Sequence, residues 1–193
     1  MNHELGIKEK FKYKLYPKRY FLYASRGFTL IELLIVLAVL SILAVVLMTL
    51  INPVAQFQKA RDAQRKSDLA QIQKTLEAYF DDNGQYPAHS KTPDAVWFRI
   101  KPPTGYIEWG STWTAYNTML PKDPTSSSRN YVYYAGPNGQ SYWLYASLER
   151  TSDLQVCNGG AACTNAAVNG LSVACGSSVW PCNYGATSPN TSP

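Results

Sequence analysis

Residues 26–51 read RGFTLIELLIVLAVLSILAVVLMTLI, and this nearly unbroken run of hydrocarbon side chains decides how the rest of the chain is organised. Its apolar part, residues 28–51, contains 24 residues, and a helix needs about 20 to cross the hydrocarbon core of a bilayer. The run carries one carboxylate, Glu32. A charged side chain inside a membrane helix costs roughly 2.5–3.5 kcal/mol on insertion scales, so we expect Glu32 to have a partner or a function.

The positive charge of the chain is concentrated ahead of this run. Residues 1–27 hold seven Lys or Arg and two Glu, a net charge of +5, which equals the formal charge of the whole 193-residue chain. Residues 28–193 are neutral, and they lack the clustered Lys and Arg that phosphate contacts need, so no nucleic-acid partner is expected. A basic segment ahead of a membrane helix stays in the cytoplasm, which places the residues after 51 outside.

The apolar run leads into Pro53 and then into a polar helical pattern. Because proline removes a backbone donor, a kink or local melting is expected near residues 49–53 of one helix that spans residues 28–82. Asp82-Asn83-Gly84 predicts the end of that helix. In its outer half apolar side chains recur at helical spacing, and the charged side chains lie mostly off this face. The apolar set is Leu69, Ile72, Leu76, Tyr79 and Phe80; the charged set is Lys59, Arg61, Asp62, Arg65, Lys66 and Asp68, with Asp62 and Lys66 spaced as a helical ion pair.

The residues after the helix predict a small domain built on a hairpin. Prolines punctuate residues 84–125 and leave room for short helical segments near residues 93–100 and 114–120. Residues 131–148 read as strand, turn and strand around an Asn-Gly pair, which is typical of a β-hairpin. We expect its aromatic side chains to be half core and half surface rather than a binding face. They are Tyr131, Tyr133, Tyr134, Tyr142, Trp143 and Tyr145.

The last 40 or so residues are rich in Ala, Asn, Gly, Ser and Thr and contain all the cysteines. An even number of cysteines in an exported domain favours disulfides, and three pairings remain open. A zinc site is disfavoured because no C-x-x-C pair occurs and the histidines, His3 and His89, lie far away in the sequence. A short strand is expected at residues 171–175, and residues 185–193 are expected to fray. The cysteines are Cys157, Cys163, Cys175 and Cys182.

The motif GFTLIE at residues 27–32, followed by an apolar run, resembles the processing site of type IV prepilins and type II secretion pseudopilins. A secretory signal has a shorter apolar core and a small-residue cleavage site behind it, which this sequence lacks. The resemblance implies that a prepilin peptidase cuts after Gly27 and that Phe28 becomes the methylated first residue. It also implies that Glu32, with Thr29 beside it, serves assembly by pairing with the terminal amine of a neighbouring subunit. Two buried opposite charges relieve each other's desolvation.

Two further segments resemble the same family. Residues 79–87 look like the end of the pilin helix and its exit turn, and residues 120–124 with the hairpin look like the globular domain of major pseudopilins. In that class an acidic calcium-binding loop usually follows the hairpin. Here only Asp153 supplies an acidic side chain after Glu149, whereas calcium takes about 6–8 oxygen ligands, so no calcium or other metal site is expected.

We therefore expect an α+β, pilin-like fold. In this fold a long amino-terminal helix packs on a small antiparallel sheet, and a disulfide-tied tail follows the sheet. The expected function is that of a structural subunit of a type IV pilus or a type II secretion pseudopilus. Such a subunit is first anchored in the inner membrane and is later part of a helical filament outside it. The expected divisions are a basic leader at 1–27 that is removed, a transmembrane or filament-core helix at 28–52, its amphipathic outer half at 53–83, a globular domain at 84–150 and a cysteine-containing tail at 151–193.

The expected partners are other copies of the chain, other pilins or pseudopilins, prepilin peptidase, the inner-membrane assembly platform and the membrane itself. No cofactor is expected. One alternative is a minor pilin, a tip module that serves adhesion or DNA uptake. Another is an anchored enzyme, but no acid and nucleophile accompany His89, so no catalytic residue is predicted. The hairpin favours a pseudopilin and the cysteines favour a pilin, which leaves the type of filament open.

Overall fold

The computed structural model describes residues 27–91, 98–176 and 179–193. The chain forms two compact units, of which the first extends to Leu50 and the second spans Ile51–Pro193. The leader expected at residues 1–27 lies outside the described residues, apart from Gly27.

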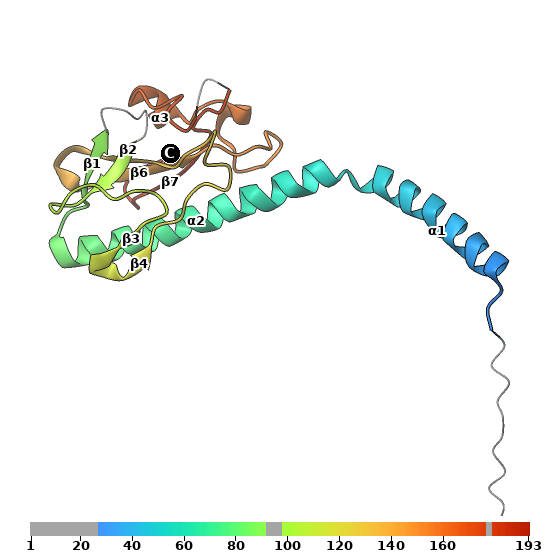
Figure 1. Ribbon diagram of the computed structural model, residues 1–193. Coiled ribbons are helices and arrows are strands. Elements are labelled where there is room, and N and C mark those ends of the chain that lie inside the picture. Colours follow the sequence, from blue (N-terminus) through green and yellow to red (C-terminus); the bar gives the residue numbers. More distant parts are fainter. Residues whose placement is uncertain (1–26, 92–97, 177–178) are drawn as a thin grey trace, which may run out of the picture. The chain divides into compact units, whose positions relative to one another are not determined.

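Helix α1, Leu30–Ile51, makes up most of the described part of the first unit and ends one residue beyond it (Figure 1). By length and composition it can cross a membrane over Leu30–Thr49. The hydroxyls of Ser41 and Thr49 donate to main-chain carbonyls four and three residues earlier, at 2.7 and 2.8 Å. These polar groups are therefore satisfied within the helix, as a hydrocarbon environment requires.

The helix that the sequence predicts over residues 28–82 is divided in two at Asn52. Asn52 takes a left-handed conformation, with φ 43°, and helix α2 begins directly after it at Pro53–Asn83. Two local effects produce this break. The residue before a proline is pushed out of the helical region, and the Asn52 side-chain oxygen accepts a hydrogen bond from the Ala55 N–H, at 3.3 Å, which caps the new helix.

The predicted end of the helix is confirmed. Helix α2 stops at Asn83, and Gly84 follows in a left-handed conformation with φ 69°. The Gly84 N–H donates to the Phe80 carbonyl at 2.7 Å, which satisfies one of the last free carbonyls of the helix.

Strand pairing in the described part of the second unit is antiparallel throughout (Figure 1). The hairpin predicted at residues 131–148 is confirmed as β5 and β6. The helical segment expected near residues 93–100 is wrong where it is described, because residues 98–101 form a strand. The strands are β1 (Ala88–Lys91) with β2 (Phe98–Lys101), β3 (Thr112–Trp113) with β4 (Thr118–Met119), and β5 (Val132–Ala135) with β6 (Tyr142–Ala146) and β7 (Tyr184–Thr187).

Short helices fill the connections. The segment expected near residues 114–120 forms a single 3₁₀ turn and then strand β4. The short helices are η1 (Thr114–Tyr116), η2 (Pro137–Gly139), η3 (Cys157–Gly160) and α3 (Thr164–Val168).

Both faces of the β5–β6–β7 sheet are covered, one by α2 and the other by the tail (Figure 1). Side chains alternate along β5 and β6, so neighbouring residues contribute to opposite faces. The expectation of a half-exposed aromatic hairpin is therefore wrong, because the tail packs on the second face. On the α2 side Tyr131, Tyr133, Tyr142 and Leu144 join Leu69, Ile72 and Leu76; on the tail side Val132 and Tyr145 join Cys163, Ala166, Leu171, Cys175 and Cys182.

The disulfide-tied tail is confirmed, with pairs Cys157–Cys163 and Cys175–Cys182. Two other expectations for the tail are wrong. Residues 171–175 form turns rather than a strand, and the end expected to fray contains β7, which pairs with β6. The indole of Trp143 also donates to the Ser192 carbonyl at 2.9 Å and holds the last residues against the sheet.

Asn183 extends the pairing of β6 with β7 by means of its side chain. The strands pair as far as Ala146 with Tyr184. Just beyond, the Leu148 N–H donates to the Asn183 side-chain oxygen at 2.7 Å, and the Asn183 side-chain N–H donates to the Leu148 carbonyl at 3.2 Å. The buried carboxamide thus takes the place of a peptide group, and the backbone of Leu148 is fully paired where the strand has ended.

Removing the second disulfide, by Cys175→Ala with Cys182→Ala, is expected to loosen residues 150–185 and to lower the free energy of unfolding by about 2–3 kcal/mol. The tail has few apolar side chains to stabilise its folded form, so it depends on the disulfide, which stabilises it by restricting the unfolded chain. Limited proteolysis with mass mapping measures the effect. Treating the wild-type chain with reductant under mildly unfolding conditions should reproduce it, and unchanged protease resistance in both experiments would contradict this role.

Candidate functional site

The amino-terminal segment places Thr29 and Glu32 in one local motif at the start of α1. The Glu32 N–H donates to the Thr29 hydroxyl oxygen at 3.2 Å. A threonine followed three residues later by glutamate is the spacing of a capping box, in which the hydroxyl satisfies one of the free N–H groups of the first helical turn. Thr29 thereby fixes where the helix begins, and so fixes the position of Glu32 along the helix axis.

The carboxylate of Glu32 has no ion-pair or hydrogen-bond partner among the residues that the structure describes. The hydrocarbon side chains around it along α1 are themselves uncovered in a single chain. A carboxylate in such a place is costly when the helix is in lipid, unless a cation is supplied from elsewhere. A second chain is a source of one.

Gly27 and Phe28 precede the helix, outside regular structure, and both are exposed. A Cβ added to Gly27 meets nothing within 4 Å, so neither space nor packing requires glycine there. Glycine does allow another protein to approach the backbone closely. Among the described residues, no contact requires glycine at position 27.

The second unit is organised around Arg65, whose side chain is 0% exposed. All five N–H groups of its guanidinium have an acceptor. The acceptors are both carboxylate oxygens of Asp123 at 2.8 and 3.1 Å, Asp62 at 2.9 Å, Glu149 at 3.0 Å and the Thr125 hydroxyl at 2.9 Å. Arg65 therefore joins helix α2 to two segments far along the chain.

Contacts within this arginine cluster favour the charged forms of Arg65 and Glu149. Burial by itself lowers the pKa of Arg65, but hydrogen bonds to Asp123, Glu149 and Asp62 outweigh it, and the pKa is raised above its ordinary value. Hydrogen bonds from Arg61, and then from Arg65, lower the pKa of Glu149 to about 2 against the opposing effect of burial. Asp62 also accepts from the backbone N–H groups of Glu149 and Arg150, at 2.8 and 3.0 Å, and so fixes the chain just after the hairpin.

Tyrosine hydroxyls add a second set of polar contacts to α2. Tyr131 donates to Asp68 at 2.6 Å, and Tyr86 and Tyr142 donate to the two oxygens of Glu77 at 2.8 and 3.1 Å. Burial, followed by the hydrogen bond to Asp68, raises the pKa of Tyr131 well above its ordinary value. The aromatic core thus presents donors to the carboxylates of the helix, and no carboxylate in this set is left unpaired.

The residues after the hairpin do not fit a calcium site. Glu149 is held by Arg61 and Arg65, and both oxygens of Asp153 accept from Lys66 at 2.7 Å. Among the described residues no group of three or more His, Cys, Asp or Glu side chains is placed to hold a metal ion. Basic side chains thus occupy the positions around these carboxylates that a calcium ion would need.

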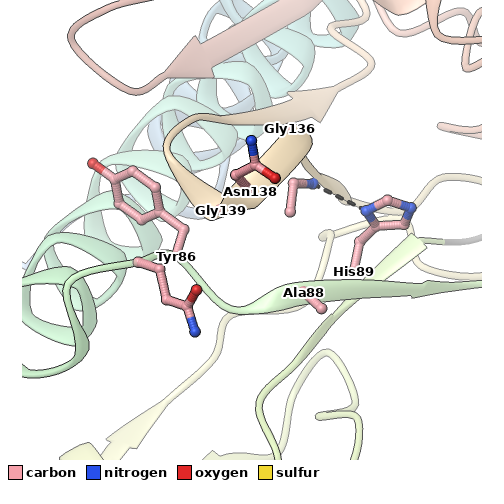
Figure 2. Close-up of a pocket in the computed structure, with 8 residues that line it drawn as sticks. Tyr86, Ala88, His89, Gly136, Asn138 and Gly139 are labelled. Atoms are coloured by element: carbon pink, nitrogen blue, oxygen red, sulfur yellow. Dashed lines mark hydrogen bonds between the residues drawn. The ribbon is translucent and has the colours of Figure 1, made fainter.

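His89 lies beside a shallow cavity of about 360 Å³ between β1 and the β5–β6 turn (Figure 2). Its Nδ1 accepts from the Ala135 N–H at 3.2 Å, and its ring stacks on Tyr134 with centroids 4.4 Å apart. Burial lowers the pKa of His89, in keeping with a neutral imidazole that accepts a hydrogen bond. Through this hydrogen bond His89 supports the edge of strand β5.

The sequence pattern misses the arginine cluster. It predicts that Asp62, Arg65 and Asp68 lie mostly off the buried face, yet all three are buried. It also predicts a pair between Asp62 and Lys66, whereas Asp62 pairs with Arg65 and Lys66 with Asp153. The sequence offers one hint of this burial. These charged residues lie in the same part of the helix as the apolar residues of its buried face, where a charge can be buried if it is paired.

Two family models match the chain. The prokaryotic N-terminal methylation motif matches residues 23–48, and the model of type II secretion system (T2SS) protein G matches residues 52–149, just over half of the chain. Searches of curated proteins and of solved structures returned no match. The apolar helix and the methylation motif fit a protein anchored in the inner membrane. The chain belongs to the type II secretion system protein G family, and it is a structural subunit of the pilin and pseudopilin class.

Proposed function

We propose that this chain is a pseudopilus subunit that prepilin peptidase processes between Gly27 and Phe28 and that assembles into a helical filament at the inner membrane. The observation that carries the proposal is the carboxylate of Glu32 in an apolar helix, five positions beyond Gly27, which has no partner among the described residues. The match of residues 52–149 to protein G supports a secretion pseudopilus over a pilus.

In this proposal each segment has one role. The leader at residues 1–27 stays in the cytoplasm and is removed, and α1 then holds the subunit in the membrane. Residues 53–193 lie outside, where α2 carries the globular domain and the tail. On assembly the α1 helices form the filament core, and the new amine of Phe28, which is methylated, pairs with Glu32 of a neighbouring subunit. Thr29 positions Glu32 for that pairing, and the break before Pro53 separates the filament-core helix from the domain helix.

Intact-mass spectrometry of the chain extracted from membranes tests the processing step. The expected mass is that of residues 28–193 with one added methyl group, less the hydrogens of both disulfides. The matched control is Gly27→Leu, which leaves the described contacts unchanged but puts a bulky side chain at the cut. That variant should retain the leader. A wild-type chain that keeps Met1, or one that is cut elsewhere, would refute the proposal.

A further inference from the structure

A side chain, rather than a backbone ladder, links strand β1 to strand β5. The β1–β2 pair and the β5–β6–β7 sheet are separate sheets. Between them the Ala135 N–H of β5 donates a hydrogen bond to Nδ1 of His89 on β1, at 3.2 Å (Figure 2). Ala135 is buried, so this N–H depends on His89 for an acceptor.

This hydrogen bond requires a neutral imidazole. A ring nitrogen accepts a hydrogen bond only while it carries no proton, so the single ring proton of neutral His89 lies on Nε2. Protonation adds an N–H at Nδ1, directly opposite the N–H of Ala135. Two donors then face each other, so the ring has to move away and the buried Ala135 N–H loses its acceptor.

The aromatic side chains around His89 also favour its neutral form. The imidazole stacks on Tyr134 of β5, with ring centroids 4.4 Å apart, and lies 5.4 Å from the ring of Phe98 on β2. Burial lowers the pKa of His89 below its ordinary value of 6.5. A group that is neutral and fixed in this way responds to acid near physiological pH.

The charged groups near His89 do not offset this preference. No carboxylate is among the described residues that line the two cavities beside the imidazole. On β2, Lys101 lines one of these cavities, and the Arg99 guanidinium pairs with Glu108 at 2.6 Å. From the segment before β1, the Tyr86 hydroxyl donates to Glu77. A proton on His89 therefore gains no anionic partner in the described surroundings.

We propose that His89 is a pH-sensitive switch, which holds β1 against the edge of β5 at neutral pH and releases it in acid. The release is local, because other contacts hold the two ends of the strand pair near the core. The Tyr133 hydroxyl donates to the Pro87 carbonyl at 2.6 Å, and Ile100 is fully buried in the core beside α2. A free N–H on an edge strand can pair with another chain, and at neutral pH His89 occupies this one.

Acid weakens the link because the pKa of His89 is lowered in the folded protein. The unfolded chain takes up the proton near pH 6.5, whereas the folded chain takes it up at lower pH. The contribution of the link to stability is therefore complete above about pH 6.5 and is lost as the pH falls through the folded pKa. Glu149 of the arginine cluster, with a pKa of about 2, stays charged over this range.

Amide exchange of the full chain in detergent micelles, followed by NMR, tests the switch. After correction for intrinsic exchange, the Ala135 amide should exchange at least about tenfold faster at about pH 4.5 than at about pH 7.5. The loss of protection should follow the titration of the His89 ring, read from its own ring signals, with a midpoint below 6.5. The Ile107 amide, which donates to the Ile100 carbonyl at 2.9 Å, should stay protected throughout.

His89→Asn is the matched control. Its side-chain oxygen can take the place of Nδ1 and accepts at any pH, so Ala135 should stay protected at both pH values. This control also accounts for other titrating groups, including Asp94, which lies outside the described residues. His89→Phe keeps a ring for the stack without an acceptor, and its Ala135 amide should exchange fast at both pH values.

Three results would each overturn the switch. They are an Ala135 amide that is equally protected at both pH values in the wild type, the same acid-induced loss in His89→Asn, and an equal loss at Ile107, which would show general acid unfolding. If His89→Phe does not fold, His89→Leu replaces it, with the same expected exchange. The measurement uses single chains in micelles, so its outcome is independent of filament assembly.

Discussion

Arg65→Ala is expected to lower the free energy of unfolding of the second unit by about 3–5 kcal/mol. The change leaves two buried carboxylates, those of Asp62 and Asp123, without the cation that compensates them, and it removes one of the cations that contact Glu149. Domain stabilities are about 5–15 kcal/mol, so this is a large share of the total. Urea unfolding followed by tryptophan fluorescence measures it selectively, because every tryptophan lies after residue 51.

Arg61→Ala is the matched control for this prediction. Arg61 also binds Glu149 from α2, but its side chain is 34% exposed and it has no other carboxylate partner in the described contacts. Its loss should therefore cost less than about 1 kcal/mol. A similar decrease in the free energy of unfolding in the two variants would show that the contribution of Arg65 to stability does not depend on its burial. Arg65→Lys should fall between them, because it keeps the charge and loses the planar array of donors.

The pH dependence provides a second check on the same cluster. The pKa of Glu149 is lowered from 4.5 to about 2 in the folded protein, so its contribution to stability is present above about pH 4.5. That contribution is lost as the pH falls from there towards 2, where the carboxylate becomes protonated in both states. The stability difference between wild type and Arg65→Ala should therefore narrow over this range.

Glu32→Leu is expected to abolish filaments while the protein still inserts into the membrane. Leucine makes the helix more apolar, so insertion is no weaker. In the proposed assembly, the variant loses the ion pair of Glu32 and leaves the terminal amine of each neighbouring subunit buried without a partner. Such a loss costs about 3 kcal/mol or more, a factor of more than about 100 for each subunit added. Membrane fractionation measures insertion, and electron microscopy of sheared filaments measures assembly.

Ser41→Leu is the control for that experiment. Ser41 is also polar and also lies in α1, but its hydroxyl already donates to a carbonyl within the helix. Its replacement should leave filament yield close to that of wild type. Normal filaments from Glu32→Leu would remove Glu32 from the assembly step, whatever the control shows.

The features that the sequence predicts correctly are local ones. The apolar helix depends on a continuous run of side chains, and the β5–β6 hairpin depends on two short β-forming segments around an Asn-Gly turn. Both signals lie within about 25 residues of sequence, so no distant partner can reverse them.

The arginine cluster and the tail depend instead on distant partners. Asp123 and Glu149 lie 58 and 84 residues after Arg65, and the sequence of α2 does not predict that they are its partners. The tail looks too poor in apolar residues to fold, but Val132 and Tyr145 point to the face opposite α2 and need cover. A hairpin that is apolar on both faces requires a layer on each side. That pattern is readable in the sequence and predicts that the tail is ordered.

The five acceptors around Arg65 also bear on how the domain comes apart. They come from α2, from the loop at residues 123–125 and from the chain after β6. The desolvation of the guanidinium is therefore compensated only when all three segments have packed around it. We expect such an interaction to form late, after the folding transition state. Interactions of that kind slow unfolding and hardly change the folding rate. We therefore expect the cluster to act mainly as a kinetic barrier, which lengthens the lifetime of the folded domain more than it hastens its formation.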